Sequence, residues 1–105
     1  MAQIIQKIIA TVTRAAMHEL KAVPLQPADI KTGFVHCVYS SQTADKVAKF
    51  FPETHVTILD IDPTKLGPGL ELRPEMNPGG TTIYPHIYGG AIPLEAVIKE
   101  TGFDS

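Results

Sequence analysis

The order of apolar and polar residues predicts short strands with two helices set between them. Residues 4–11 are rich in β-branched side chains, which favours a strand. Side chains alternate between the two faces of a strand, so Lys7 shares a face with Ile5 and Ile9. One face of this first strand is therefore mixed rather than purely apolar.

The first predicted helix runs from Thr13 through Leu20. The Thr13 hydroxyl can cap it by accepting a hydrogen bond from an early backbone N–H. Ala16 and Met17 complete an apolar stripe with Leu20. The prolines within residues 23–27 then predict a break in regular structure.

The second predicted helix begins at Ser40 or Ser41 and runs to about Phe51, where Pro52 ends it. It carries the clearest amphipathic pattern in the chain. The apolar side chains at helical spacing are Ala44, Val47, Ala48 and Phe51.

The remaining periodic segments are predicted to be strands: residues 33–38, 54–61, 70–73, 83–88 and 95–100. Both faces of 54–61 are largely apolar, which favours a central position in the sheet. Residues 62–67 predict one helical turn with a cap and an early proline, and 75–82 predict a loop. The order of elements indicates one α+β domain over residues 1–105, with two helices packed on a mostly antiparallel or split sheet.

Composition narrows the classes of partner. The chain has 105 residues and a formal net charge of −2, without a basic stripe, so we do not expect it to bind duplex nucleic acid. No apolar run is long enough to span a membrane. The single cysteine, Cys37, forms no intramolecular disulfide and is typical of a reducing compartment, so we expect a cytoplasmic protein.

Two histidines in strand-like segments are the candidate catalytic residues. His36 shares a strand face with Phe34, and His86 shares one with Tyr84 and Tyr88. A row of tyrosine, histidine and tyrosine can stack on a ring and donate hydrogen bonds. The following Gly89 and Gly90 would let a ligand approach the backbone. The competing interpretation is a pair of hydrogen-bonded core histidines beside tyrosines that seal the core edge.

Other chemistry is less well supported by the pattern. Cys37 and His36 are adjacent in a strand and point apart, so they do not form a nucleophile–base pair, although Cys37 could still use His86. Zinc held by His36, His86 and a carboxylate or Cys37 is a less favoured alternative, because no spacing typical of a zinc site is present. The sequence also contains no phosphate-binding loop. Glu71 and Glu75 are expected to be solvated, and His18 and His55 to lie on the surface.

The chain resembles a known family, the domain of unknown function 952 family. The resemblance rests on GFVHC at 33–37 followed by Gln42, ILDIDPTKLG at 58–67, YPHIYG at 84–89 and IPLEAV at 92–97. It implies a fold similar to the ADP-ribosyltransferase superfamily, with a split and strongly bent sheet. Ligands of that superfamily, usually NAD, lie in the cleft between the two halves.

The sequence also departs from the family pattern. Arg73 stands where many members have a glutamate, which would be the natural partner of an oxocarbenium-like centre. Arg73 can bind a phosphate instead. Gln6 and Lys7 replace a first-strand histidine that some members have. These changes weaken the case for ADP-ribosyl transfer.

Three hypotheses follow. The first is a cleft for a nucleotide- or NAD-like ligand. If the protein is active, it would be a glycosyl- or ADP-ribosyl-transfer enzyme. Its catalytic residues would be His36 and His86, and its ligand-binding residues Phe34, Arg73, Tyr84, Tyr88 and Gly89. The second is a non-catalytic binding or interaction module that keeps the fold. The third is a metal site at His36 and His86.

Overall fold

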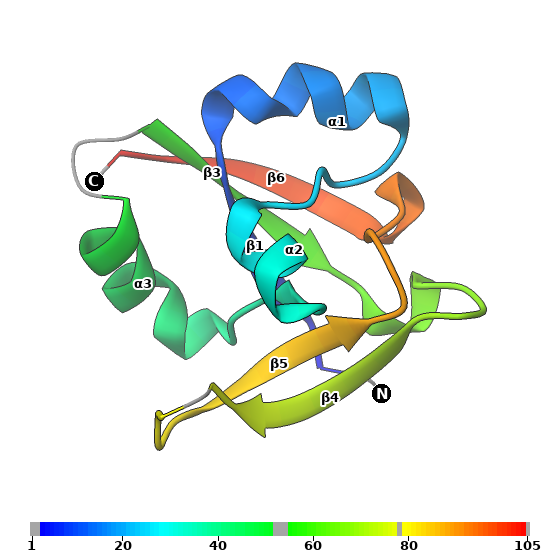
Figure 1. The fold of residues 1–105 in the computed structure, drawn as a ribbon. Helices are drawn as coiled ribbons and strands as arrows, with labels where there is room; N and C mark the ends of the chain where they lie inside the picture. The colour runs from blue at the N-terminus through cyan, green and yellow to red at the C-terminus, as the bar shows by residue number, and fades with distance from the viewer. Residues whose placement is uncertain (1–2, 52–54, 78, 105) are drawn as a thin grey trace.

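The computed structural model describes residues 3–51, 55–77 and 79–104. Within them the chain forms an α+β domain with two antiparallel three-stranded sheets (Figure 1). The predicted helix stop at Pro52 and the predicted strand start at Thr54 lie outside the described residues. The α+β class and the split of the sheet into two are confirmed.

The first sheet has the order β1 (Ile5–Ala10), β3 (His55–Ile61), β6 (Val97–Asp104). Its central strand β3 has buried side chains on both faces from Val56 to Leu59. The prediction of a central position for this segment is therefore confirmed. The last strand starts later than predicted, because residues 94–96 form a 3-10 turn before it.

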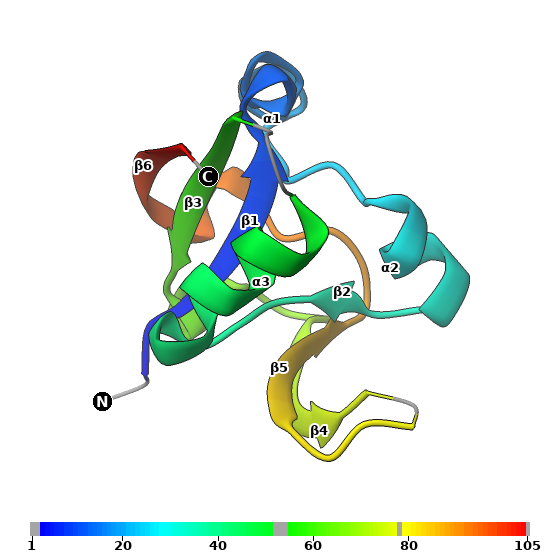
Figure 2. The same cartoon turned by 90° about the vertical axis from the view of Figure 1, so that its left-hand side faces the viewer.

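The second sheet has the order β2 (Val35–His36), β5 (Ile83–Tyr88), β4 (Glu71–Met76). Figure 2 shows the β4–β5 hairpin projecting from the end of the molecule opposite α1. Strand β2 is only two residues long, shorter than predicted, and β4 extends through Glu75 and Met76, which were predicted to lie in a loop. An isolated bridge between Gln6 and Val38 connects the two sheets.

The described residues form three α-helices rather than the two predicted: α1 (Arg14–Leu20), α2 (Pro27–Thr32) and α3 (Thr43–Phe50). Helix α2 was not predicted, and it begins at Pro27, the last residue of the predicted break. Pro27 stands at its start, where a missing N–H costs nothing. The Gln26 backbone N–H donates to the Asp29 carboxylate at 2.9 Å and closes the first turn.

The two predicted helices differ in detail from expectation. The Thr13 side chain makes no capping hydrogen bond, and Leu20 is 65% exposed while Met17 is fully buried. Helix α1 therefore docks through one apolar side chain instead of a stripe. Helix α3 is preceded by a 3-10 turn at Ser40–Gln42, where the Tyr39 N–H donates to the Gln42 side chain.

The buried side chains form two clusters. The larger joins the facing sides of the two sheets, and includes Ile5, Ile9, Val35 and Ile87. The smaller lies under α3, and consists of Ile8, Val38, Val47, Val56 and Ile58, with Phe51 and Tyr84 at its margin. None of the helices in the described part of the chain is long and apolar enough to cross a membrane.

Candidate functional site

The register of β2 against β5 brings the two candidate histidines together. His36 pairs directly with His86, and Val35 pairs with Ile87. Side chains of directly paired residues lie on the same face, so Val35 and Ile87 enter the core while the histidines share the opposite face. Their ring centroids are 5.8 Å apart. The sequence left open whether these histidines meet, and the register shows that they lie side by side.

Asp29, on α2, orients the His36 ring. Its Oδ1 lies 2.9 Å from His36 Nδ1 and also accepts the His36 backbone N–H at 3.0 Å. A carboxylate only accepts hydrogen bonds, so Nδ1 carries the proton. In the neutral ring, Nε2 is then left as a proton acceptor.

Lys7, the charged residue on the mixed face of β1, lies behind Asp29. Its side chain and that of Asp29 are each only 1% exposed, and the closest approach between their charged atoms is 3.3 Å. The ammonium also donates to Gln26 Oε1 at 2.9 Å and to the His36 carbonyl at 2.8 Å. These contacts satisfy the three donors of a lysine ammonium, which makes burial of the charge tolerable.

The charges around Asp29 keep it ionised. Burial by itself raises the pKa of its carboxyl group. The hydrogen bonds from His36, the charge of Lys7 and the backbone N–H of Gln26 outweigh that effect and lower the pKa to about 2. Asp29 is therefore a carboxylate at neutral pH, and the tautomer that it imposes on His36 is stable.

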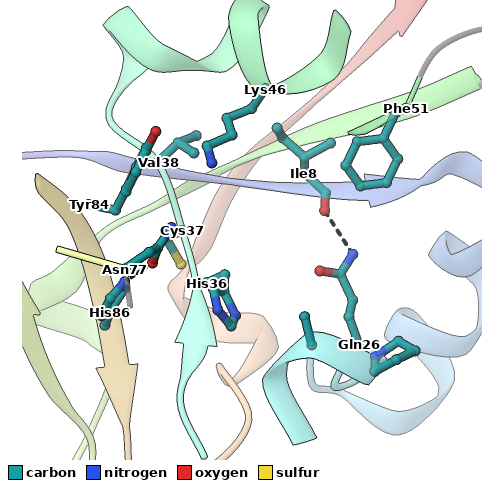
Figure 3. A pocket seen from close by; sticks show the side chains of 12 residues that line it. Ile8, Gln26, His36, Cys37, Val38, Lys46, Phe51, Asn77, Tyr84 and His86 are labelled. Atoms are coloured by element: carbon teal, nitrogen blue, oxygen red, sulfur yellow. Dashed lines mark hydrogen bonds between the residues drawn. The ribbon is translucent and has the colours of Figure 1, made fainter. Parts of the chain in front are cut away.

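His36 opens onto a pocket of about 520 Å³ between α2, α3 and β5 (Figure 3). This volume lies in the usual range for small-molecule sites, about 300–1,000 Å³. The lining residues are Ile8, Gln26, Pro27, Ala28, His36, Cys37, Val38, Lys46, Phe51, Asn77, Tyr84 and His86. Most of this wall is apolar, and no aspartate or glutamate is among these described residues.

His86 is held more tightly than His36. It is 1% exposed, its Nδ1 lies 3.2 Å from Glu75 Oε1, and its Nε2 lies 2.8 Å from Asn77 Oδ1. The Phe34 ring stacks on it with centroids 4.0 Å apart. Burial lowers the pKa of His86. Both ring nitrogens already have partners in the protein, so His86 would have to break a contact to transfer a proton.

Glu75 belongs to this network, although its side chain is 38% exposed. Its Oε1 accepts the Tyr88 hydroxyl at 2.5 Å as well as lying beside His86. The hydrogen bond from Tyr88 lowers the pKa of Glu75, and the same bond raises the pKa of Tyr88. Tyr88 therefore braces β5 against β4, and it is not among the pocket-lining residues.

The structure places three predicted ligand-binding residues outside the pocket lining as well. Arg73 forms an ion pair with Glu71 at 2.7 Å and lies over the Tyr88 ring at 4.4 Å. Phe34 covers His86. Gly89 has a φ of +112°, and a Cβ atom there would lie 2.0 Å from the Gly69 carbonyl oxygen. Glycine is required at this position by the approach of another backbone segment, and that contact occupies the space proposed for a ligand.

Tyr84 lines the pocket together with His86, and its role in ligand binding stays a prediction. The ammonium of Lys46, on α3, lies 4.2 Å from the centre of the Tyr84 ring. His18 is a surface residue, as expected, and contacts Glu100 at 2.9 Å.

The remaining chemical alternatives have no structural basis in the described residues. Cys37 is buried, and burial raises the pKa of its thiol to about 12, so it is not available as a nucleophile. Within residues 3–51, 55–77 and 79–104, no group of three or more His, Cys, Asp or Glu side chains could hold a metal ion. A metal site at His36 and His86 would have only these two ligands.

Comparisons with known proteins give a family match and a fold. A family model described as "Protein of unknown function (DUF952)" matches residues 8–100. The crystal structure of protein CC0527 from Caulobacter crescentus is 24% identical, with a TM-score of 0.82, covering 97% of this chain and 87% of that one. Its solution NMR structure is 24% identical, with a TM-score of 0.77, covering 96% of this chain and 84% of that one. At this identity the likeness shows the fold alone. No curated protein matches the sequence.

Proposed function

The chain belongs to the DUF952 family of proteins of unknown function, and for this member we propose a small-molecule site in which His36 accepts a proton from the ligand. The ligand class that we propose is nucleotide-like, with NAD and its fragments as the first candidates. A nucleobase or a nicotinamide ring would lie against the apolar wall, and a hydroxyl or N–H group of the ligand would reach His36 Nε2.

The observation that carries this proposal is the Asp29–His36 contact of 2.9 Å in the wall of a pocket. An aspartate that accepts the Nδ1 proton fixes both the orientation and the tautomer of a histidine, which is how catalytic histidines are commonly held. The His36 side chain is 29% exposed, so a ligand can reach it. A general base positioned in this way typically accelerates a reaction by a factor of about 10²–10⁴.

We assign His86 a positioning role rather than a catalytic one. Its contacts with Glu75 and Asn77 hold the end of the β4–β5 hairpin beside the pocket, because Asn77 follows β4 directly. Phe34, stacked on His86, supports the same wall. A positioning role accounts for the burial of His86. It also accounts for the two contacts of its ring nitrogens, which a proton-transfer group would have to release.

Glycosyl or ADP-ribosyl transfer receives less support from the site. Such a reaction calls for a carboxylate beside the reacting sugar carbon. Asp29 is engaged by Lys7 and His36, and Glu75 by Tyr88 and His86. The likeness to the ADP-ribosyltransferase superfamily thus stays a proposal about ancestry. Ligand binding without turnover is the alternative that fits the same geometry.

Calorimetric titration of the wild-type protein with NAD, ADP-ribose and AMP tests the proposal. We expect at least one to bind more tightly than about 1 mM, and His36→Gln to weaken its binding at least about tenfold, since glutamine cannot accept the proton. His18→Gln, a change at an exposed histidine, is the matched control and should bind as the wild type does. Absence of binding at millimolar ligand, or equal binding by His36→Gln, would overturn the proposal.

A further inference from the structure

Asn77 is a polar residue of the pocket wall whose side-chain amide has a partner on its oxygen only. It follows β4 directly and lines the pocket together with His86 (Figure 3). Its Oδ1 lies 2.8 Å from His86 Nε2, whereas its Nδ2 makes no hydrogen bond to a residue that the structure describes. No buried side-chain nitrogen or oxygen in the described part of the chain lacks a partner, so this amide nitrogen is open to solvent. Its two N–H donors are therefore available at the wall of the pocket.

The β4–β5 hairpin and the ring of His86 hold Asn77 in place. Met76, the preceding residue, forms the last pair of the β4–β5 ladder with Ile83. The backbone carbonyl of Asn77 accepts the Gly80 N–H at 2.9 Å. His86, which contacts the side-chain oxygen, is itself only 1% exposed. Asn77 is therefore fixed at its backbone and at its side-chain oxygen, and the amide nitrogen is the part left for a ligand.

The contact with His86 sets the direction of the Asn77 amide. A carbonyl oxygen only accepts hydrogen bonds, so His86 Nε2 carries the proton that Asn77 Oδ1 accepts. A second proton on Nδ1 of the ring, towards Glu75, would leave this direction unchanged. Turning the amide by half a turn would place its N–H groups against the Nε2 proton. No aspartate or glutamate stands among the described lining residues to take up the amide donors.

The pocket therefore offers a ligand two polar groups of opposite character. His36 Nε2 accepts a hydrogen bond, and Asn77 Nδ2 donates one. Both residues line the same pocket of about 520 Å³ and lie next to His86, so one small molecule can contact both. The rest of the wall is mostly apolar. A flat ring compound that carries both an N–H or hydroxyl donor and a carbonyl oxygen matches this arrangement.

We propose that Asn77 selects the ligand of this pocket by donating a hydrogen bond to a carbonyl oxygen on the ligand's ring. This inference rests on the proposed function and names the chemical class of its ligand: a nucleotide-like compound whose ring carries a carbonyl group. The carbonyl belongs either to an oxo-substituted base, such as hypoxanthine, or to the carboxamide of nicotinamide. Adenine has an amino group in place of the hypoxanthine carbonyl, so the N–H groups of Asn77 would face the N–H groups of that base.

Paired probes distinguish a carbonyl from an amino group, and one source of the carbonyl from the other. IMP and AMP differ only in the base, hypoxanthine in the first and adenine in the second. NAD carries the nicotinamide carboxamide, which ADP-ribose lacks. In calorimetric titrations of the wild type, we expect IMP to bind more tightly than AMP, or NAD more tightly than ADP-ribose, by at least about tenfold. The first preference identifies the base carbonyl as the group that is recognised, and the second identifies the carboxamide.

A single substitution tests whether Asn77 is responsible for the preference. Asn77→Asp keeps an oxygen towards His86 and replaces the amide nitrogen by an oxygen that only accepts hydrogen bonds. We expect this variant to reduce the wild-type preference to below about threefold. Gln3→Glu, the same chemical change at an exposed amide outside the lining, is the matched control and should preserve the preference. Unfolding midpoints of the two variants within a few degrees of the wild type show that the comparison concerns folded protein.

The outcomes distinguish this inference from the proposed function. If neither pair shows a preference in the wild type and His36→Gln weakens the binding of all four probes, the pocket is a ligand site and the role given to Asn77 is wrong. A preference for AMP over IMP would mean that the amide presents its oxygen to the ligand, and it would overturn the inference. A preference that Asn77→Asp retains is set by another residue and contradicts the inference equally. If none of the four probes binds at millimolar concentration, both proposals fail.

Discussion

At the scale of single residues, the site depends on a buried charge that is compensated on several sides. Asp29 accepts hydrogen bonds from the Lys7 ammonium, the His36 ring and two backbone N–H groups. An isolated charge at 1% exposure would be too costly to retain. The Lys7–Asp29 pair therefore matters for stability mainly because removing one side chain would leave the buried charge of the other without a counter-charge.

We predict that Asp29→Asn destabilises the protein by about 3–5 kcal/mol at neutral pH, because Lys7 then lies buried without a counter-charge. The substitution should also remove the part of the free energy of unfolding that the wild type loses in acid. The folded pKa of Asp29, about 2, lies below the value of 3.8 for the unshifted group. Its contribution, about 2 kcal/mol, is thus complete above pH 4 and is lost as the pH falls towards 2.

Urea unfolding between pH 2 and pH 6 measures both effects. Asp45→Asn, a change at an exposed aspartate on α3, is the control and should keep the wild-type dependence on pH. An Asp29→Asn protein whose stability falls with acid as steeply as the wild type's would show that Asp29 is not the group responsible.

At the scale of elements, two differences between the predicted and observed structure involve prolines. Pro27 was interpreted as part of a break, yet it occupies the first position of α2. The strand predicted over 70–73 stopped before Pro74, yet β4 continues past this proline at the edge of its sheet, where proline is tolerated. Pro74 also pairs with Pro85, so two missing N–H groups fall at the same place in the ladder.

Gly89 illustrates a different limit. The sequence shows that this position permits unusual backbone angles, and the structure shows that a second backbone segment at Gly69 is what requires it. Local pattern cannot distinguish a glycine that accommodates a ligand from one that accommodates the chain itself.

We predict that Gly89→Ala destabilises the fold by at least about 2 kcal/mol, because the new Cβ would lie 2.0 Å from the Gly69 oxygen at a φ of +112°. Gly102→Ala is the matched control, since nothing lies within 4 Å of a Cβ at that position. Chemical denaturation of the two variants side by side gives the comparison. Equal stability of the two would mean that the β5 end can move away from residue 69 at little cost.

At the scale of the whole molecule, the site is assembled from segments that are far apart in the sequence. Lys7 comes from β1, Asp29 from α2, His36 from β2 and Lys46 from α3. Strand periodicity was sufficient to predict that His86 shares a face with Tyr84, but the meeting of His36 with His86 depended on the pairing of β2 with β5. It could not identify Asp29, because α2 itself was missed, nor Lys46, which resembled any other polar residue of an amphipathic helix.

Lys7 is the missed residue whose signal was present. A lysine on the same strand face as Ile5 and Ile9 must either leave the core or find acceptors within it. The structure supplies those acceptors from α2 and β2. A charged residue at an inward position of a strand therefore indicates that a buried partner exists, even where the partner's position is not predictable.

The most direct test of the central claim is the protonation state of His36, observed by two-bond ¹H–¹⁵N NMR correlation at a pH well above neutrality. Because Asp29 accepts the Nδ1 proton, we predict the Nδ1–H tautomer, with Nε2 unprotonated and facing the pocket. A His36 ring found as the Nε2–H tautomer would present a donor to the pocket and would contradict the account of this residue as a proton acceptor.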